Sequence, residues 1–132
     1  MKGVDTTFLI DLLRNDKGAV LKSLELEREP MVFTTEANVY EVVSGVQQMK
    51  ANRDVSMGNA QTLFRRLTVL PLDRKAAIKA GEIAGELSMA GKMIDDIDCL
   101  AAGILMTNGC DTVVTRNARH FGRIKGLKVE IY

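Results

Sequence analysis

Short apolar runs alternate with longer stretches of helical periodicity along the whole chain. The apolar runs fall at 1–4, 31–35, 67–72, 111–115 and 127–132. Between them, apolar positions recur at the three- and four-residue spacing that predicts helices, as in TTFLIDLL and DCLAAGILM. Parallel strands need crossover connections, which are usually helices. The pattern therefore predicts an α/β fold, a three-layer sandwich with a mostly parallel sheet flanked by helices.

Two further helical stretches, 18–27 and 55–67, do not follow a strand directly and predict an inserted helical hairpin or arm. The sequence has no internal repeat, linker or low-complexity segment, so we expect one domain over 1–132. Four residues of the helix over 95–109 form an apolar stripe and are expected in the core: Ile97, Leu100, Ala101 and Leu105.

Composition narrows the function classes only slightly. The chain is 46% hydrophobic and 27% charged, which is typical of a globular domain. Its formal net charge of +1 provides no global basic field, so any affinity for nucleic acid must come from a local patch. Cys99 and Cys110 are too few and too far apart for a zinc site or a disulfide scaffold. We expect a reduced, cytoplasmic protein without a signal peptide or a membrane span.

Polar side chains follow several of the predicted strands, where open parallel sheets bind ligands. Asp5 comes directly after the first strand, and Thr115 and Asn117 follow the fourth. Glu41 lies in the helix after the second strand, and Asp98 lies early in the helix before the fourth. We expect these groups, which come from different βα units, to converge on one pocket.

Each candidate also has a structural interpretation. Asp5 is a suitable N-cap for the helix that follows it, with Thr6 as a competing cap. A helical glutamate such as Glu41 is commonly solvated, and Asn117 is a common turn residue. Asp98 stands beside an apolar stripe, where an unpaired carboxylate is costly and needs a partner. The residues taken singly leave both interpretations open.

Four segments together resemble the PIN-domain family of metal-dependent ribonucleases, and most closely its small VapC-type toxins. In order, and over nearly the whole chain, these segments are VDTTFLIDLL, YEVVSG, DCLAAGILMTNG and VVTRNARHFGRIKGLKV. The first family aspartate corresponds to Asp5, and the helical glutamate to Glu41. The fourth family position corresponds to Asn117, with Thr115 holding the hydroxyl position.

The third carboxylate of the family depends on the alignment register. It corresponds to Asp98 if Ala102 and Gly103 take the two small positions that follow it. The other register, with Ala101 and Ala102 in those positions, would put Ile97 there. Because the position requires a carboxylate, we prefer Asp98.

The resemblance implies a metal-dependent endoribonuclease that hydrolyses single-stranded or structured RNA as the toxin of a toxin–antitoxin pair. Asp5, Glu41, Asp98 and Asn117 would be its catalytic residues. Asp5 and Asp98 would bind the metal, with Glu41 binding directly or through water. Oxygen ligands favour Mg²⁺ or Mn²⁺ over zinc. Because Asn117 is neutral, we expect one firm metal site and a second filled mainly when RNA brings its phosphate.

The segment after the fourth strand also predicts how substrate is held. Thr115, Arg116, Arg119 and His120 are the expected substrate-binding residues, and Arg123 and Lys125 extend this basic stretch. A solvated loop is the alternative interpretation. The resemblance further implies a small antitoxin partner, whose tail would cover the acidic pocket, and a homodimer.

Two other functions compete with the nuclease interpretation. A receiver or other flavodoxin-like binding module has the same βα alternation, but it would have an acidic pair after its first strand, where Asp5 stands alone. A non-catalytic PIN-like scaffold is the second competitor. The presence of Asp5, Glu41 and Asp98 argues against it.

Overall fold

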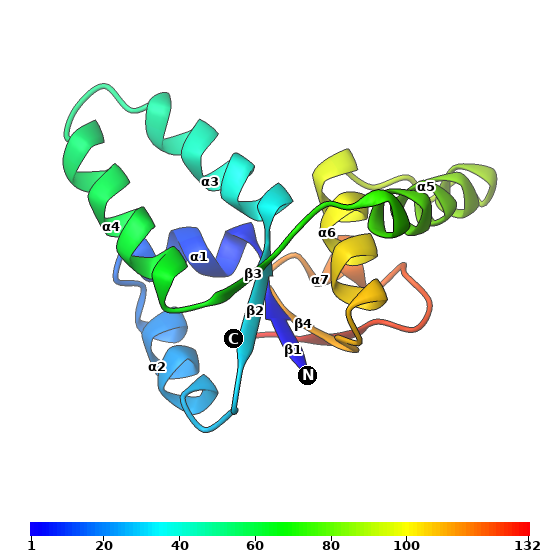
Figure 1. Cartoon of the computed structure of the whole chain (residues 1–132), viewed down its shortest axis with the longest axis horizontal. Helices are drawn as coiled ribbons and strands as arrows, with labels where there is room; N and C mark the ends of the chain where they lie inside the picture. The colour runs from blue at the N-terminus through cyan, green and yellow to red at the C-terminus, as the bar shows by residue number, and fades with distance from the viewer.

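Five parallel strands form one sheet at the centre of the molecule (Figure 1). The computed structural model describes residues 1–132. The strands are β1 (Lys2–Val4), β2 (Val32–Thr35), β3 (Thr68–Leu70), β4 (Thr112–Val114) and β5 (Lys128–Glu130). Their order across the sheet is β3-β2-β1-β4-β5, and every neighbouring pair is parallel. Flavodoxin-like and receiver domains have the order 2-1-3-4-5. The observed order therefore argues against that alternative.

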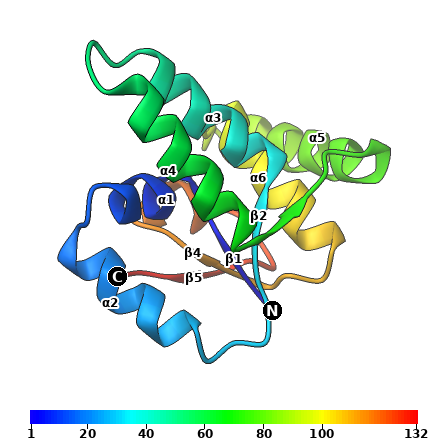
Figure 2. The same cartoon turned by 60° about the vertical axis from the view of Figure 1, so that its left-hand side comes forward.

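Helices cover both faces of the sheet and complete the expected three layers (Figures 1 and 2). They are α1 (Thr6–Leu13), α2 (Lys17–Leu26), α3 (Glu36–Gln47), α4 (Arg53–Arg65), α5 (Arg74–Met89), α6 (Asp96–Thr107) and α7 (Ala118–Phe121). On one face lie α1, α2 and α4, and on the other α5, α6 and α7, while α3 packs against α1, α4 and α6. None of the seven helices combines the length and apolarity needed to cross a bilayer.

Two apolar cores lie on opposite faces of the sheet, because successive strand residues point to opposite sides. Val4 and Val114, which are paired in register, belong to the core under α1, α2 and α4. Val113 belongs to the core under α5 and α6, and its register partner is Gly3. A Cβ on Gly3 would clash with a methyl carbon of Leu105. The missing side chain therefore lets α6 sit directly on β1.

The helices α5 and α6 also pack closely, which holds α6, the helix that carries Asp98, in place. A Cβ on Gly103 would lie 2.7 Å from the backbone nitrogen of Ala80 and 2.8 Å from the carbonyl oxygen of Ala76. Backbone in another helix cannot move away as a flexible side chain can. Gly103 is thus required where the two helices meet.

The two additional helices predicted from the sequence are present, and each packs against the helix that precedes it. α4 packs against α3, and α2 packs against α1. In each pair a short connection joins the helices, so consecutive helices become neighbours. An asparagine with left-handed backbone lies in each connection, Asn15 at φ 57° and Asn52 at φ 61°. The helical hairpin is therefore formed by α3 and α4.

Two smaller expectations need correction. Of the four residues expected in the core, Ile97 and Leu100 are only partly buried, whereas Ala101 and Leu105 have no exposed surface. The stretch after β4, expected as a loop, contains the short helix α7. Phe121 closes that helix and is fully buried in the core. The buried phenylalanine explains why this polar segment is held against the sheet.

Candidate active site

Asp5 ends β1 and begins α1, and its side chain is almost fully buried, with 2% of its surface exposed. One oxygen, Oδ1, accepts the backbone N–H of Phe8 at 3.1 Å and the hydroxyl of Thr7 at 2.7 Å. The other, Oδ2, accepts the hydroxyl of Thr115 at 2.6 Å. Asp5, and not Thr6, is therefore the helix cap. A carboxylate has about four acceptor positions, so capping leaves capacity for a further ligand.

Thr115 connects the end of β4 to the end of β1. Besides donating to Asp5, its hydroxyl oxygen accepts the backbone N–H of Asn117 at 2.7 Å and lies 3.2 Å from the hydroxyl oxygen of Thr7. β1 and β4 are neighbours on the two sides of the point where the strand order reverses. Ligands of open parallel sheets bind at that point.

Asp98 lies in the first turn of α6 and is 7% exposed. Its Oδ2 accepts the side-chain amide of Asn117 at 3.1 Å and lies 2.8 Å from Nδ1 of His120. The amide nitrogen of Asn117 is also 3.0 Å from that imidazole nitrogen. These two residues are the partners that a carboxylate beside an apolar stripe requires. His120, expected to bind substrate, thus has one ring nitrogen engaged with Asp98.

A buried polar network that the sequence analysis missed positions Glu41. Thr35 caps α3, and its hydroxyl donates to the side-chain oxygen of Asn38 at 2.7 Å. The amide of Asn38 donates in turn to the hydroxyl of Thr6 at 3.0 Å. Asn38 has no exposed surface, and the network joins the start of α3 to the start of α1. Asn38 lies four residues before the apolar Val42, so the helical spacing was the signal in the sequence that Asn38 faces the core.

All four predicted catalytic residues line one cleft at this edge of the sheet. The cleft has a volume of about 740 Å³ and lies between α1, α3, α6 and the segment after β4. Five carboxylates but only two guanidinium groups line it: Asp5, Asp11, Glu41, Asp95 and Asp98, with Arg14 and Arg116. The cleft is therefore strongly acidic, although the whole chain is nearly neutral.

Burial dominates the protonation of the two central carboxyls. It raises the pKa of Asp5 to about 6, although hydrogen bonds from Thr115 and Thr7 act in the opposite direction. Burial likewise raises the pKa of Asp98, against the hydrogen bond with His120. The charge of Asp98 adds to the increase at Asp5. Without a bound cation, the ionised forms of Asp5 and Asp98 are therefore disfavoured.

The donor set of the cleft fits a divalent cation. One ligand atom from each of Asp95, Asp98 and His120 lies within 4.8 Å of the others. Asp95 was not among the metal ligands expected from the sequence, and His120 was expected to bind substrate. Because Nδ1 of His120 faces Asp98, we assign the imidazole to orienting that carboxylate. The remaining donors are oxygens, which suit Mg²⁺ or Mn²⁺.

Only part of the basic stretch after β4 is available to a substrate. Arg116 is paired with Asp16 at 2.6 Å and Asp11 at 3.2 Å, and it stacks on the ring of Tyr132 at 4.7 Å. Arg123 donates to the carbonyl oxygens of residues 92 and 93, so it ties the α5–α6 connection instead of facing the cleft. Arg119 is exposed and forms no ion pair. The network around Arg116 was not predicted.

Comparison with known proteins gives matches that span nearly the whole chain. The family model of the PIN domain matches residues 3–127. The tRNA(fMet)-specific endonuclease VapC of Salmonella typhimurium is 28% identical over 127 residues, which cover 96% of this chain and 94% of that protein. Ribonuclease VapC19 of Mycobacterium tuberculosis is 26% identical over 129 residues, covering 97% and 98%.

Solved structures of toxin–antitoxin complexes have the same fold. The DNA-bound VapBC of Salmonella typhimurium contains a chain with a TM-score of 0.86 and 27% identity, covering 98% of this chain and 96% of that one. VapBC2 of Rickettsia felis, bound to a promoter DNA fragment, gives a TM-score of 0.89 at 20% identity, with coverage of 99% and 98%. The second likeness shows the fold alone, since its identity is low.

Proposed function

Since the chain belongs to the PIN-domain family, we propose that it is a metal-dependent endoribonuclease and the toxin of a toxin–antitoxin pair. The observation that carries the proposal is the convergence of Asp5, Glu41, Asp98 and Asn117 on one acidic cleft at the switch point of the sheet. The ribonuclease names of two relatives that span nearly the whole chain support the same activity. A non-catalytic scaffold would have no need to gather buried carboxylates.

In this proposal, Asp5 and Asp98 hold a Mg²⁺ or Mn²⁺ ion, with Glu41 contributing directly or through water and Asp95 at the margin. Such an ion, when bound, supplies positive charge that activates water and neutralises the phosphoryl oxygens. Capping and Thr115 fix the orientation of Asp5. Asp98 is fixed by Asn117 and His120. These carboxylates are therefore oriented before substrate arrives, which lowers the cost of ordering them during the reaction.

The proposed reaction is hydrolysis of a phosphodiester in single-stranded or structured RNA. An oxygen of water forms a bond to phosphorus, one ester bond breaks, and a proton passes to the leaving oxygen. Asn117 lines the cleft. Thr115, expected to bind substrate, is fully buried and instead holds Asp5 in place. Arg116 and the exposed Arg119 are the candidates for contacting RNA phosphates. For Arg116 this requires release from Asp11 or Asp16 as a phosphate takes their place.

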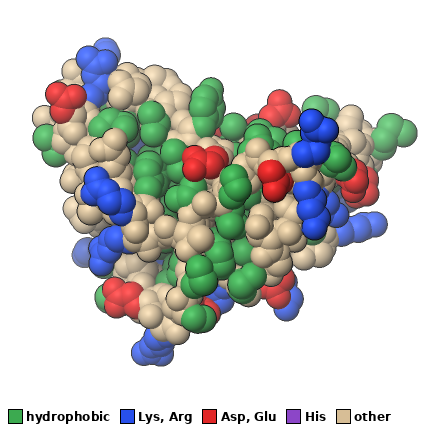
Figure 3. Space-filling model, viewed as in Figure 1, with side chains coloured by type: hydrophobic (Ala, Val, Ile, Leu, Met, Phe, Trp, Pro, Cys, Tyr) green, Lys and Arg blue, Asp and Glu red, His purple; other side chains and the backbone are tan.

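An antitoxin partner is supported by a second groove and by the complexes that the structural neighbours form. The groove lies between α1, α2 and α4, has a volume of about 540 Å³, and contains Leu12, Leu26, Leu63 and Leu67. Figure 3 shows hydrophobic side chains exposed over the middle of one face of the molecule. Exposed apolar surface of this kind marks protein-binding sites. We also expect a homodimer acting in the cytoplasm, where the free cysteines stay reduced.

Cleavage of a labelled single-stranded RNA with and without divalent metal tests the activity. We expect cleavage in Mg²⁺ or Mn²⁺, none in EDTA, and a loss of at least about a hundredfold for Asp98→Asn. Glu82→Gln, which removes an exposed acid of α5 outside the cleft, is the matched control and should cleave normally. Mg²⁺ should raise the melting temperature of the wild type but much less that of Asp98→Asn. Undiminished cleavage in excess chelator would refute the proposal.

A further inference from the structure

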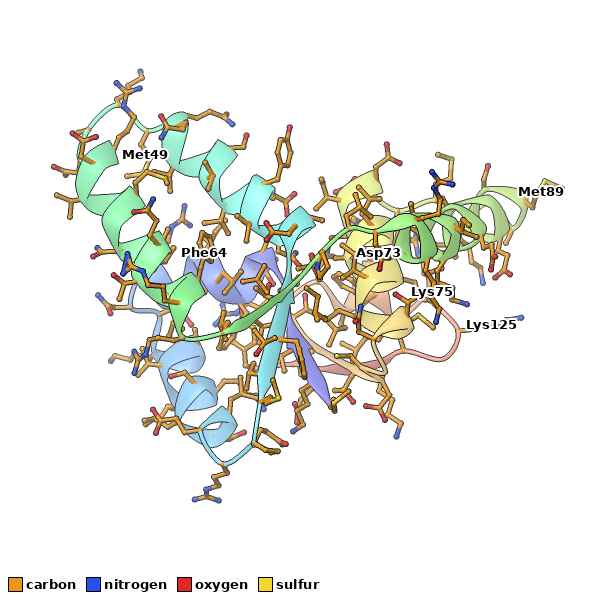
Figure 4. The ribbon with its side chains drawn as sticks, viewed as in Figure 1. Met49, Phe64, Asp73, Lys75, Met89 and Lys125 are labelled. Carbon is orange, nitrogen blue, oxygen red and sulfur yellow. The ribbon has the colours of Figure 1, made fainter.

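A smaller pocket lies beside the acidic cleft, between α1, α3 and α4. Its volume is about 210 Å³, and its walls are mainly apolar: Ile10, Leu13, Val42, Val46 and Met49. Figure 4 shows Met49, one of the lining residues, near the connection between α3 and α4. A cavity of about 150 Å³ is enough to hold benzene, whereas typical sites for drug-sized ligands begin near 300 Å³. The pocket therefore fits one aromatic ring system.

The pocket and the acidic cleft are adjacent and share part of their walls. Ile10, Arg14 and Gly45 line both of them. Gly45 is one helical turn after Glu41 on α3, about 6 Å along the helix axis. A Cβ at Gly45 would meet nothing within 4 Å, so packing does not require a glycine here. The absence of a side chain at Gly45 leaves open space where the pocket and the cleft meet.

Polar groups at the border of the pocket are unused by the protein. Arg14 is exposed and forms no ion pair, in contrast to Arg116 on the other side of the cleft. Ser56 and Asn59 of α4 line the pocket, and their side chains form no hydrogen bond within the chain. These features match the parts of one nucleotide. The apolar walls suit the faces of a base, the hydrogen-bonding groups at one side suit its edge, and the free guanidinium group of Arg14 suits its phosphate.

We infer that this pocket binds the base of a nucleotide next to the scissile phosphate and gives the enzyme a base preference at that position. The inference rests on the proposed ribonuclease function and adds a specificity site to it. Val42, Val46 and Met49 would contact the faces of the base, and Ser56 and Asn59 its edge. Arg14, at the junction of cleft and pocket, would contact the linking phosphate. The preference comes from the edge contacts, because every base has similar faces.

Sequencing the ends of products from a randomised single-stranded RNA pool tests this inference. The wild type should prefer one base, or a purine or pyrimidine class, about tenfold at a fixed position beside the cut, which is the discrimination that one good base contact provides. Ser56→Leu fills the pocket without touching the acidic cleft, and it should remove the preference and raise the KM for RNA, while Mg²⁺ binding remains. Ser88→Leu, the same change on the exposed surface of α5, should retain it.

Three further measurements make the outcome decisive. If Ser56→Leu does not fold, Met49→Ala, which removes one wall, should reduce the same preference. Titration of the wild type with the four nucleoside 5′-monophosphates, followed by NMR of the Met49 methyl group, reports on the pocket even if no RNA is cleaved; shifts that favour one nucleotide support the inference. Absence of any such shift overturns it, as does a preference that survives Ser56→Leu. Weakened antitoxin binding with an intact preference would assign the pocket to the protein partner and also overturn it.

Discussion

Replacing Asp5 by asparagine separates the two roles of this residue, helix cap and metal ligand. As a cap, asparagine is about as good as aspartate, and its carbonyl oxygen can still accept the N–H of Phe8 and the hydroxyl of Thr7. Its amide would face the hydroxyl oxygen of Thr115, which must rotate its own proton away. Asp5→Asn therefore keeps most of the local hydrogen bonding and removes the buried charge.

The direction of the pH effect follows from the raised pKa. Below the ordinary value of 3.8, Asp5 is neutral in the folded and unfolded states and costs nothing. As the pH rises from there to about 6, the unfolded state loses the proton first, so the wild type loses stability across this range and stays penalised above it. The rise in pKa corresponds to roughly 3 kcal/mol at full ionisation. Allowing for the weakened contact with Thr115, we expect Asp5→Asn to gain about 1–3 kcal/mol at pH 8 and little or nothing at pH 4.

Urea unfolding in EDTA at pH 4, 6 and 8 measures this difference directly. Asp73→Asn is a matched control, because Asp73 caps α5 through a bond from the N–H of Ala76 at 2.9 Å but is exposed. It should show no comparable gain at pH 8. Saturating Mg²⁺ should stabilise the wild type and leave Asp5→Asn nearly unchanged. A loss of stability in Asp5→Asn at pH 8 without metal would mean that capping by the charged carboxylate outweighs its burial, and the reasoning would be wrong.

Two further substitutions separate packing from site geometry. Leu105→Ala should cost about 2–5 kcal/mol in urea unfolding, because the side chain is fully buried against β1, while cleavage per folded molecule persists; loss of kcat at full folding would contradict its purely structural role. His120→Ala should lower Mg²⁺ affinity by roughly 10- to 100-fold in calorimetric titration, since it removes the partner that orients Asp98; unchanged affinity would leave His120 with substrate binding alone.

The strand pattern and the positions of the acidic residues could be predicted from the sequence because they depend on local order. Strands with short apolar runs, each followed by a helix, leave few possible topologies. Since parallel strands end at one edge, Asp5, Glu41, Asp98 and Asn117 were expected to meet, and they line one cleft. Their catalytic and metal-binding roles remain predictions.

Features that depend on contacts between distant segments could not be predicted. The pairing of α4 with α3 depends on a tight reversal at Asn52, which periodicity does not reveal. The contact between His120 and Asp98 joins residues separated by a strand and a turn. Arg116 looked like a free cation in the sequence, yet Asp11, Asp16 and Tyr132 hold it. A basic residue in a loop thus indicates a phosphate site only when its carboxylate neighbours in space are known.

Because the cleft is acidic, the proposed metal ion would be needed for RNA binding as well as for the reaction. Five carboxylates line the cleft that a scissile phosphate would enter. Arg116 is paired with one of them, Asp11, and with Asp16, so four carboxylates remain beside the single free guanidinium group of Arg14. Two like charges about 4 Å apart repel by roughly 4 kcal/mol near a protein surface. RNA would therefore be excluded from the cleft until a divalent cation offsets these carboxylates. Burial of Asp5 and Asp98 lowers the stability of the metal-free protein when these carboxyls are ionised. The same burial would hold both side chains in position for the cation. The lower stability without metal and the activity with metal would therefore have one structural origin.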